Sequence, residues 1–195
     1  MLMNRTASMP RQRGFAIIEV LVTLVIVLLG MLGAAGVLVR SHQSSMEAYQ
    51  RTQALVLVED MLDRMSANRP VADCYAVTDP GAGAPHLGTG YTGVPDCGLG
   101  TPGQQATAIR DLQQWSQLLQ GAAETDAGGA FVGAMIGARG CVSYDVATDT
   151  YSVTVTWQGL GPTSAPPDEV RCAVGLYGDD AQRRALTLTM RIADL

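Results

Sequence analysis

Charge is scarce in this chain, and one long stretch has none. Charged residues make up 16% of the 195 residues, whereas soluble domains average about a quarter. No residue between Val20 and Val39 carries a charge. A run of that length suffices for a transmembrane helix, which needs about 20 apolar residues. The net charge of −5 argues against a general nucleic-acid-binding protein, although it leaves room for a local basic patch.

Recognisable catalytic motifs are also missing. The chain has only two histidines, His42 and His86, and neither belongs to a metal-binding motif. No P-loop, zinc spacing or Gly-x-Ser-x-Gly segment occurs. We therefore expect a protein that is not an enzyme and that uses no cofactor or metal. Five aspartates are expected in solvated turns rather than in a calcium site: Asp145, Asp149, Asp168, Asp179 and Asp180.

The first 14 residues form a basic leader. They include Arg5, Arg11 and Arg13 and no acid. An ordinary secretory signal is cut after its apolar core, but here the plausible cut site, Gly14–Phe15, comes before the apolar run. Cutting there would remove the leader and keep the membrane anchor. The positive-inside rule predicts that the leader stays in the cytoplasm while the rest of the chain crosses the membrane.

Glu19 lies one residue before the uncharged run. A carboxylate at the centre of a bilayer costs about 2.5–3.5 kcal/mol on insertion scales, so such a group is a candidate functional residue. If the mature chain begins at Phe15, Glu19 is its fifth residue, and the new amino terminus of a neighbouring subunit is a natural partner. The alternative is that Glu19 is merely solvated at the level of the headgroups.

The segment Gly14-Phe15-Ala16-Ile17-Ile18-Glu19 resembles the cleavage motif of type IV prepilins and of type II secretion pseudopilins. These families have a glycine, an aromatic residue and a glutamate at these positions. The resemblance implies that a prepilin peptidase cuts after Gly14, that Phe15 is N-methylated, and that Glu19 guides subunit docking. Ala16 departs slightly from the serine or threonine that is common at that position.

A second resemblance covers roughly the first 70 residues. The segments 30–33, 48–51 and 60–69, the last reading Asp-Met-Leu-Asp-Arg-Met-Ser-Ala-Asn-Arg, are similar to those of the PilV family of minor pilins, the type IV pilus modification proteins. This resemblance implies a minor pilin that acts in pilus assembly, initiation or modification. Its implied partners are the prepilin peptidase, other minor and major pilins, and the inner-membrane assembly platform.

Two other functions are also compatible with the sequence. A minor pseudopilin of type II secretion shares the cleavage motif. A tip adhesin or DNA-uptake pilin would bind its ligand through the C-terminal head, where Arg183, Arg184 and Arg191 provide a candidate basic patch for nucleic acid.

The sequence predicts one continuous helix from Phe15 to Asn68, because no proline interrupts it and Pro70 follows. Glu47 with Arg51 and Asp60 with Arg64 are favourable i,i+4 pairs. Beyond Val39 an amphipathic stripe is expected. Its members are Met46, Tyr49, Leu55, Val58, Leu62 and Met65.

Gly30, Gly33 and Gly36 share one face of the predicted helix. One interpretation is close helix–helix packing in a filament core. The other is local softness, since each glycine disfavours helix by about 1 kcal/mol relative to alanine.

The remainder, 70–195, is expected to form a small head. A Gly- and Pro-rich loop covers 78–103, and a short helix with Trp115 in the core covers 105–120. Strands are predicted over 130–136, 141–146, 151–157 and 186–192, with a hairpin at 147–150. Alternation in the later strands indicates one buried and one wet face. The expected fold is α+β and pilin-like, with a long helix packed on a small antiparallel sheet.

Four cysteines fit an oxidising compartment. Cys74 and Cys97 bracket most of the loop and are expected to pair. Cys141 and Cys172 would then form a second bridge between strands, although four cysteines allow three connectivities.

Together these features predict a leader at 1–14, a transmembrane half-helix at 15–39, an amphipathic half-helix at 40–69 and a disulfide-bonded periplasmic head at 70–195. The expected location is the inner membrane, in a single pass with the N-terminus cytoplasmic. The pilus fibre at the cell surface is the second expected location.

Overall fold

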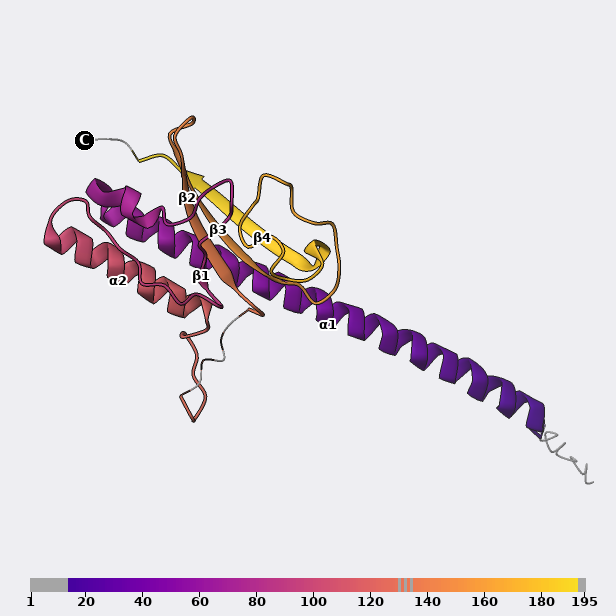
Figure 1. Ribbon diagram of the computed structural model, residues 1–195. Coiled ribbons are helices and arrows are strands. Elements are labelled where there is room, and N and C mark those ends of the chain that lie inside the picture. Colours follow the sequence, from indigo (N-terminus) through magenta and orange to yellow (C-terminus); the bar gives the residue numbers. More distant parts are fainter. Residues whose placement is uncertain (1–13, 130, 132, 134, 193–195) are drawn as a thin grey trace, which may run out of the picture. The chain divides into compact units, whose positions relative to one another are not determined.

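The computed structural model describes residues 14–129, 131, 133 and 135–192. The leader residues 1–13 therefore lie outside the described part. The chain divides into two compact units, Met1–Ser44 and Ser45–Leu195. Its elements follow one another along the chain (Figure 1) as α1 (Ile17–Ala67), η1 (Arg69–Tyr75), β1 (Leu87–Gly88), α2 (Pro102–Leu119), β2 (Arg139–Asp145), β3 (Thr150–Gln158), η2 (Asp180–Gln182) and β4 (Arg183–Met190).

The first unit contains the apolar part of α1. Its apolar side chains are exposed in the isolated chain, as Leu28 and Leu32 illustrate. Within the described residues, α1 is the one helix that is long and apolar enough to cross a membrane. Water is a poor solvent for such a surface, so this part of the helix needs lipid or another apolar partner.

The second unit contains the remainder of α1, from Ser45. The predicted amphipathic stripe is only partly right, because Met46 and Tyr49 are 52% and 55% exposed. Met46 precedes Gln50, which is the first buried residue of the helix. Tyr49 lies about 100° around the helix axis from Gln50. The buried face follows the helical repeat through Gln50, Ala54, Val58, Met61 and Met65.

The predicted loop over 78–103 contains a short strand and ends earlier than expected. In β1, Leu87 lies opposite Gly140 of β2. The helix α2 begins at Pro102, not at residue 105, because Thr101 caps it. The Gln104 backbone N–H donates to Thr101 Oγ1, and the Thr101 N–H donates to Gln104 Oε1 at 2.9 Å. This reciprocal capping box satisfies two otherwise unpaired donors of the first turn.

The sheet has the order β1-β2-β3-β4, and every neighbouring pair is antiparallel. Cys141 lies opposite Thr154 across β2 and β3, and Val155 lies opposite Leu186 across β3 and β4. The turn between β2 and β3 is the predicted hairpin. The expected α+β class, with a long N-terminal apolar helix packed on a small antiparallel sheet, is confirmed.

The first face of the sheet carries the main core. Val142, Val153 and Val155 are fully buried there, in one cluster with side chains of α1 and α2. Trp115 of α2 is fully buried, as predicted, and its indole N–H donates to the Leu57 carbonyl of α1 at 2.7 Å. Gly140 lies directly under this ring.

The second face of the sheet is not the wet face that the alternation predicts. Thr154 and Thr156 point to this face, yet both are buried. The segment 159–182 returns over the sheet and contributes Tyr177, whose hydroxyl lies 2.9 Å from Thr156 Oγ1 in a hydrogen bond. Hydroxyls are tolerated in this layer because they have partners. The residues of the second cluster are Cys141, Cys172, Ala173 and Tyr177.

Two disulfides tie irregular segments to regular ones. Cys74–Cys97 joins η1 to the loop that precedes α2. Cys141–Cys172 joins β2 to the segment 159–182. The prediction that this second bridge joins two strands is wrong, because Cys172 lies in a turn. It instead fastens the cover of the second face to the sheet.

The strand predicted over 130–136 falls partly outside the described residues, since 130, 132 and 134 are not described. Among the others, Phe131 forms an isolated bridge with Thr125.

Candidate processing and assembly site

The candidate cleavage bond, Gly14–Phe15, lies in backbone without regular structure just before α1. The first turn of the helix closes where the Glu19 N–H donates to the Ala16 carbonyl at 3.0 Å. Phe15 is 81% exposed. A peptide bond in non-helical, exposed backbone is available to a peptidase without unwinding the helix that follows.

The fold does not require glycine at position 14. A Cβ atom built on Gly14 has no atom within 4 Å, and its backbone lies outside the left-handed region. Contacts within the described chain therefore give no reason for a glycine here. Recognition by another molecule, such as a peptidase that needs a small residue before the cut, would supply one.

Glu19 lies in the first turn of α1. A carboxylate at that position interacts favourably with the helix dipole, an effect of about 0.3–1 kcal/mol at an exposed site. Within residues 14–129, 131, 133 and 135–192, Glu19 forms no salt bridge. Its first-turn position gives it a modest local role, and its cationic partner, if it has one, comes from elsewhere.

Contacts among the described residues also do not explain the three glycines in the apolar part of α1. A Cβ built on Gly30, Gly33 or Gly36 meets no atom within 4 Å. Packing among the residues that the structure describes therefore does not use their small size. Close approach of another helix and local softness remain the two interpretations.

The run that resembles the PilV family lies at the end of α1, and the structure gives it a structural role. Arg64 Nε donates to Asp60 Oδ2 at 2.8 Å, as the i,i+4 spacing predicts. Its Nη1 donates to Asp111 Oδ1 at 3.1 Å and to Gln114 Oε1 at 2.9 Å, both on α2. Arg64 thereby joins the last turns of α1 to α2.

Asn68 continues this network just past the helix end. Its side-chain N–H donates to the Gln104 carbonyl at 3.0 Å and to the Tyr75 hydroxyl at 3.2 Å. The Tyr75 hydroxyl in turn donates to Asp111 Oδ2 at 2.6 Å. Asp111 and Tyr75 are contributors that sequence reasoning missed. No spacing in the sequence predicts their role, because Asp111 and Tyr75 contact Arg64 and Asn68 only when α2 and η1 pack against the end of α1.

Two buried tyrosines make the stability of this head sensitive to alkali. Burial and the hydrogen bond to Asp111 raise the pKa of Tyr75, and burial and the hydrogen bond to Asp73 raise the pKa of Tyr151. The unfolded chain releases these protons near pH 10, whereas the folded chain holds them. Stability should therefore be unaffected by these groups below pH 10 and should fall above it, by at most about 1.4 kcal/mol per pH unit for each tyrosine, the slope that corresponds to one bound proton.

Urea unfolding of the full chain in detergent at pH 8 and pH 10.8 measures this effect. Tyr75→Phe and Tyr151→Phe should each reduce the loss between the two pH values. Tyr49→Phe, at an exposed position of α1, is the control and should not. An equal alkaline loss in the wild-type chain and in both Phe variants would contradict the assignment.

The candidate basic patch near the C-terminus does not exist as predicted. Arg183 is 1% exposed and pairs with Asp180, with Nε 2.6 Å from Oδ1. Arg184 pairs with Glu47 at 3.2 Å and donates to the Gly161 carbonyl at 2.6 Å. Of the three arginines only Arg191 is exposed. Glu47 was expected to pair with Arg51, and its pairing with Arg184 is a long-range contact that helix spacing does not reveal.

Neither histidine joins a metal site in the described chain, where no group of three or more His, Cys, Asp or Glu side chains is placed to hold an ion. His42 is exposed on α1. Burial and the nearby Arg139 guanidinium lower the pKa of His86. Of the aspartates, Asp145 and Asp179 accept hydrogen bonds from their own turns.

Comparison with known proteins gives one match. Residues 9–35 match the model of the prokaryotic N-terminal methylation motif. The match includes the candidate cut site, Glu19 and the beginning of the apolar run. No curated protein and no solved structure matches the chain.

The matched motif, together with an apolar N-terminal helix and a small antiparallel sheet, supports a type IV pilin-like protein. Proteins with this motif are processed by a prepilin peptidase and associate with other pilins. The motif and the apolar N-terminal helix fit a membrane-anchored structural protein.

Proposed function

We propose that this chain is a minor pilin of a type IV pilus, similar to the PilV family, and that it takes part in assembly, initiation or modification of the fibre. The observation that carries the proposal is the methylation motif at residues 9–35, placed so that its cut site directly precedes an apolar helix. The similarity of the run at 60–69 to PilV adds the particular family. Arg64 and Asn68 in this run bond the end of α1 to α2 and η1. The similarity at 60–69 therefore supports a head structure in common with the PilV family more directly than a binding partner in common.

The proposed mechanism follows from the order of the segments. The basic leader, 1–14, stays in the cytoplasm, and the half-helix 15–39 anchors the chain in the inner membrane. The half-helix 40–69 and the head, 70–195, lie in the periplasm, where the two disulfides form. The prepilin peptidase removes the leader, Phe15 is N-methylated, and Glu19 guides docking against other pilins on the assembly platform.

A type II secretion pseudopilin shares every element of this mechanism up to the final assembly. Recovery of the chain in filaments sheared from the cell surface would favour the pilus, and its confinement to the periplasm would favour the secretion system. A DNA-uptake role has lost its main support, because Arg183 is buried and Arg184 is engaged by Glu47 and Gly161.

The direct test is the mass of the N-terminal peptide from cells with and without the peptidase. We expect a chain that begins at methylated Phe15 only when the peptidase is present. Gly14→Leu should abolish cutting, since the variant places a branched side chain beside the scissile bond, and the precursor should keep its 14-residue leader. Because a Cβ added at position 14 meets no atom of the described residues within 4 Å, folding and membrane insertion should be unchanged.

Ala16→Ser is the matched control, because it changes a neighbouring residue toward the one common in the family and should be processed normally. Normal maturation of Gly14→Leu would contradict the cleavage assignment. An intact leader with and without the peptidase would leave an unprocessed single-pass membrane protein and would overturn the proposed function.

A further inference from the structure

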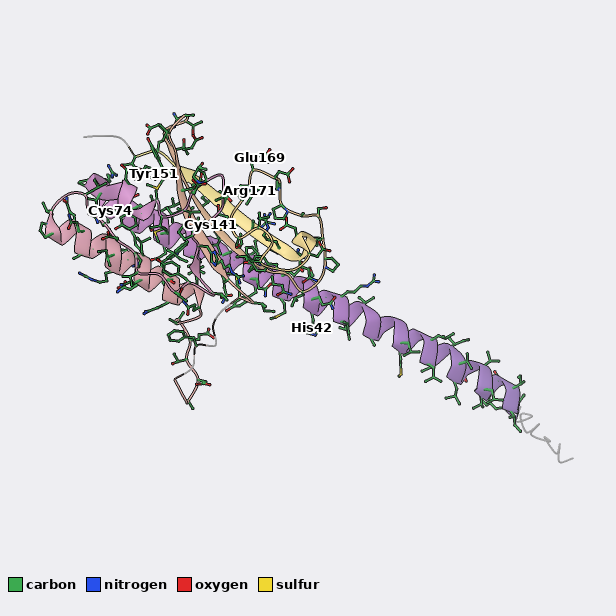
Figure 2. All side chains as sticks on the ribbon, in the orientation of Figure 1. His42, Cys74, Cys141, Tyr151, Glu169 and Arg171 are labelled. Carbon is green, nitrogen blue, oxygen red and sulfur yellow. A yellow bond between two sulfur atoms is a disulfide. The ribbon has the colours of Figure 1, made fainter. Side chains whose placement is uncertain are left out.

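One end of the head lies beside the first residues of α1 in the second unit. Arg184, at the start of β4, pairs with Glu47 of α1 and donates to the Gly161 carbonyl. The opposite end of β3 carries Tyr151, labelled in Figure 2, whose hydroxyl donates to Asp73 of η1. The end of the sheet where β3 stops and β4 starts is therefore the end near Glu47, and we call it the base of the head.

Three aliphatic side chains at the base have exposed fractions of 44–52%: Leu160, Leu176 and Ile136. Hydrogen bonds hold their three segments together. Gln158, two residues before Leu160, donates its N–H to the Ile136 carbonyl at 2.8 Å. Tyr177, next to Leu176, donates its hydroxyl to the Gly137 carbonyl at 3.0 Å. The exposed aliphatic groups are therefore gathered at one end of the head by the fold itself.

A guanidinium without a carboxylate partner lies at the same end. Arg139 stacks on the Tyr177 ring, with its Cζ 4.9 Å from the ring centroid, and its Nη1 donates to the Gly137 carbonyl at 3.0 Å. Its Nε is buried without a hydrogen-bond partner, and the residue forms no salt bridge within the described part of the chain. Arg183 and Arg184, also at the base, are both paired with acids. Arg139 is therefore the one of these three arginines that can still accept an anion.

The length of chain between the apolar run and the base keeps the base near the membrane. The uncharged run ends at Val39, and Glu47 follows eight residues later, a distance of about 12 Å along a helix. The polar layer on each side of the hydrocarbon core of a bilayer is about 5–8 Å thick. Because Arg184 contacts both Glu47 and Gly161, the base stays close to the headgroups in every molecule that α1 anchors.

We propose that the base of the head docks on the membrane surface before assembly, with its three aliphatic side chains in the headgroup layer and Arg139 on a phospholipid phosphate. The inference rests on the proposed function, which supplies the membrane. Aliphatic side chains gain free energy on leaving water, and a guanidinium binds phosphate through two parallel N–H bonds. The anchor gives the lipid surface a high effective concentration at the base, which a partner protein arriving from solution lacks.

Photo-cross-linking in vesicles tests this contact. The full-length protein is reconstituted into vesicles of phosphatidylethanolamine and phosphatidylglycerol that contain a phospholipid with a diazirine in its headgroup, and the adducts are located by mass spectrometry. We expect adducts at Ile136, Leu160 and Leu176. Tyr49 is the internal control, since it is exposed and lies two residues from Glu47 but about 200° around the helix axis from it. Tyr49 should give a much lower yield, because it is near the membrane but not at the base.

The variants separate the two parts of the contact. Leu160→Ser combined with Leu176→Ser should lower the yield at Ile136 about tenfold, which corresponds to about 1.4 kcal/mol. Val146→Ser is the matched control, because Val146 is 80% exposed but lies in the hairpin between β2 and β3, at the opposite end of the sheet. Arg139→Gln should lower the yield at Leu160, and Arg139→Lys should keep most of it, since an ammonium group also binds phosphate.

Three results would each overturn the docking: no adducts at the aliphatic side chains of the wild-type base, a yield at Tyr49 equal to theirs, or an undiminished yield at Ile136 in the double serine variant. The first two need no variant and so do not depend on how a variant folds. The N-terminal mass from cells decides the proposed function separately. A chain cut at Phe15 with an unlabelled base refutes only the docking, whereas an uncut chain with a labelled base refutes only the processing.

Discussion

Replacing Glu19 by alanine should remove the protein from assembled fibres while leaving its amount in the inner membrane unchanged. If Glu19 pairs with the amino terminus of a neighbouring subunit in an apolar environment, the variant leaves that terminus without its partner. Loss of one partner from a buried ion pair costs about 3–5 kcal/mol, which corresponds to more than about a hundredfold in incorporation. Insertion should be no worse, since one charge has left the edge of the apolar run.

The measurement is the ratio of the protein in sheared or purified filaments to that in membranes. Glu19→Gln keeps the shape but removes the charge and should fail in the same way. Glu59→Ala removes an exposed carboxylate elsewhere on α1 and should assemble normally. Normal incorporation of both Glu19 variants would refute the pairing and leave Glu19 with its local place at the helix N-terminus.

The largest effect on the head should come from the contact between Trp115 and Gly140. Trp115→Ala should lower the free energy of unfolding by about 3–5 kcal/mol, because it opens a cavity in the main core. Gly140→Ala should lower the free energy of unfolding by about 1–3 kcal/mol, because the added Cβ overpacks the same part of the core. Its Cβ would lie 2.2 Å from Cη2 of the Trp115 ring and 2.7 Å from Leu119 Cδ1.

A double-mutant cycle tests whether these two costs share one cause. In the Trp115→Ala background the ring is gone, so the added Cβ of Gly140→Ala should cost much less than it does in the wild-type chain. Urea unfolding of the full chain in detergent, followed by circular dichroism, gives the four free energies. Gly98→Ala is the control, since its Cβ meets no atom within 4 Å. Strict additivity would show that the ring does not set the cost at Gly140.

The sequence predicted where the strands of the head begin and end better than it predicted which of their residues are buried. Alternation in β3 located the strand within one residue at each end, because period two survives any packing. It did not reveal that Thr154 and Thr156 are covered. That burial depends on the segment 159–182, which has no periodicity and returns over the sheet only because Cys172 and Tyr177 meet groups on β2 and β3.

The helix shows the same division between local and long-range information. The absence of proline predicted α1 to within two residues at its start and one at its end. The buried face was only partly predicted, because it depends on which side of the helix meets the sheet and α2. Similarly, the sequence predicted a basic patch that includes Arg183 and Arg184. In the fold these two arginines form salt bridges with Asp180 and Glu47.

The candidate site at the N-terminus is predictable for a different reason. Gly14, Phe15 and Glu19 act on other molecules, so their spacing in the chain carries the whole signal and folding adds little to it. The structure contributes the finding that Gly14 has no role in packing within the described residues.

The contacts along the second part of α1 have a mechanical consequence. Tension applied to this helix along its axis would load its side-chain attachments to the head in parallel, as a shear, so that several must break together rather than one after another. Such a joint resists force through a slow unfolding rate more than through equilibrium stability. The attachments are Glu47 to Arg184, the Leu57 carbonyl to Trp115, Arg64 to Asp111, and Asn68 to the Gln104 carbonyl.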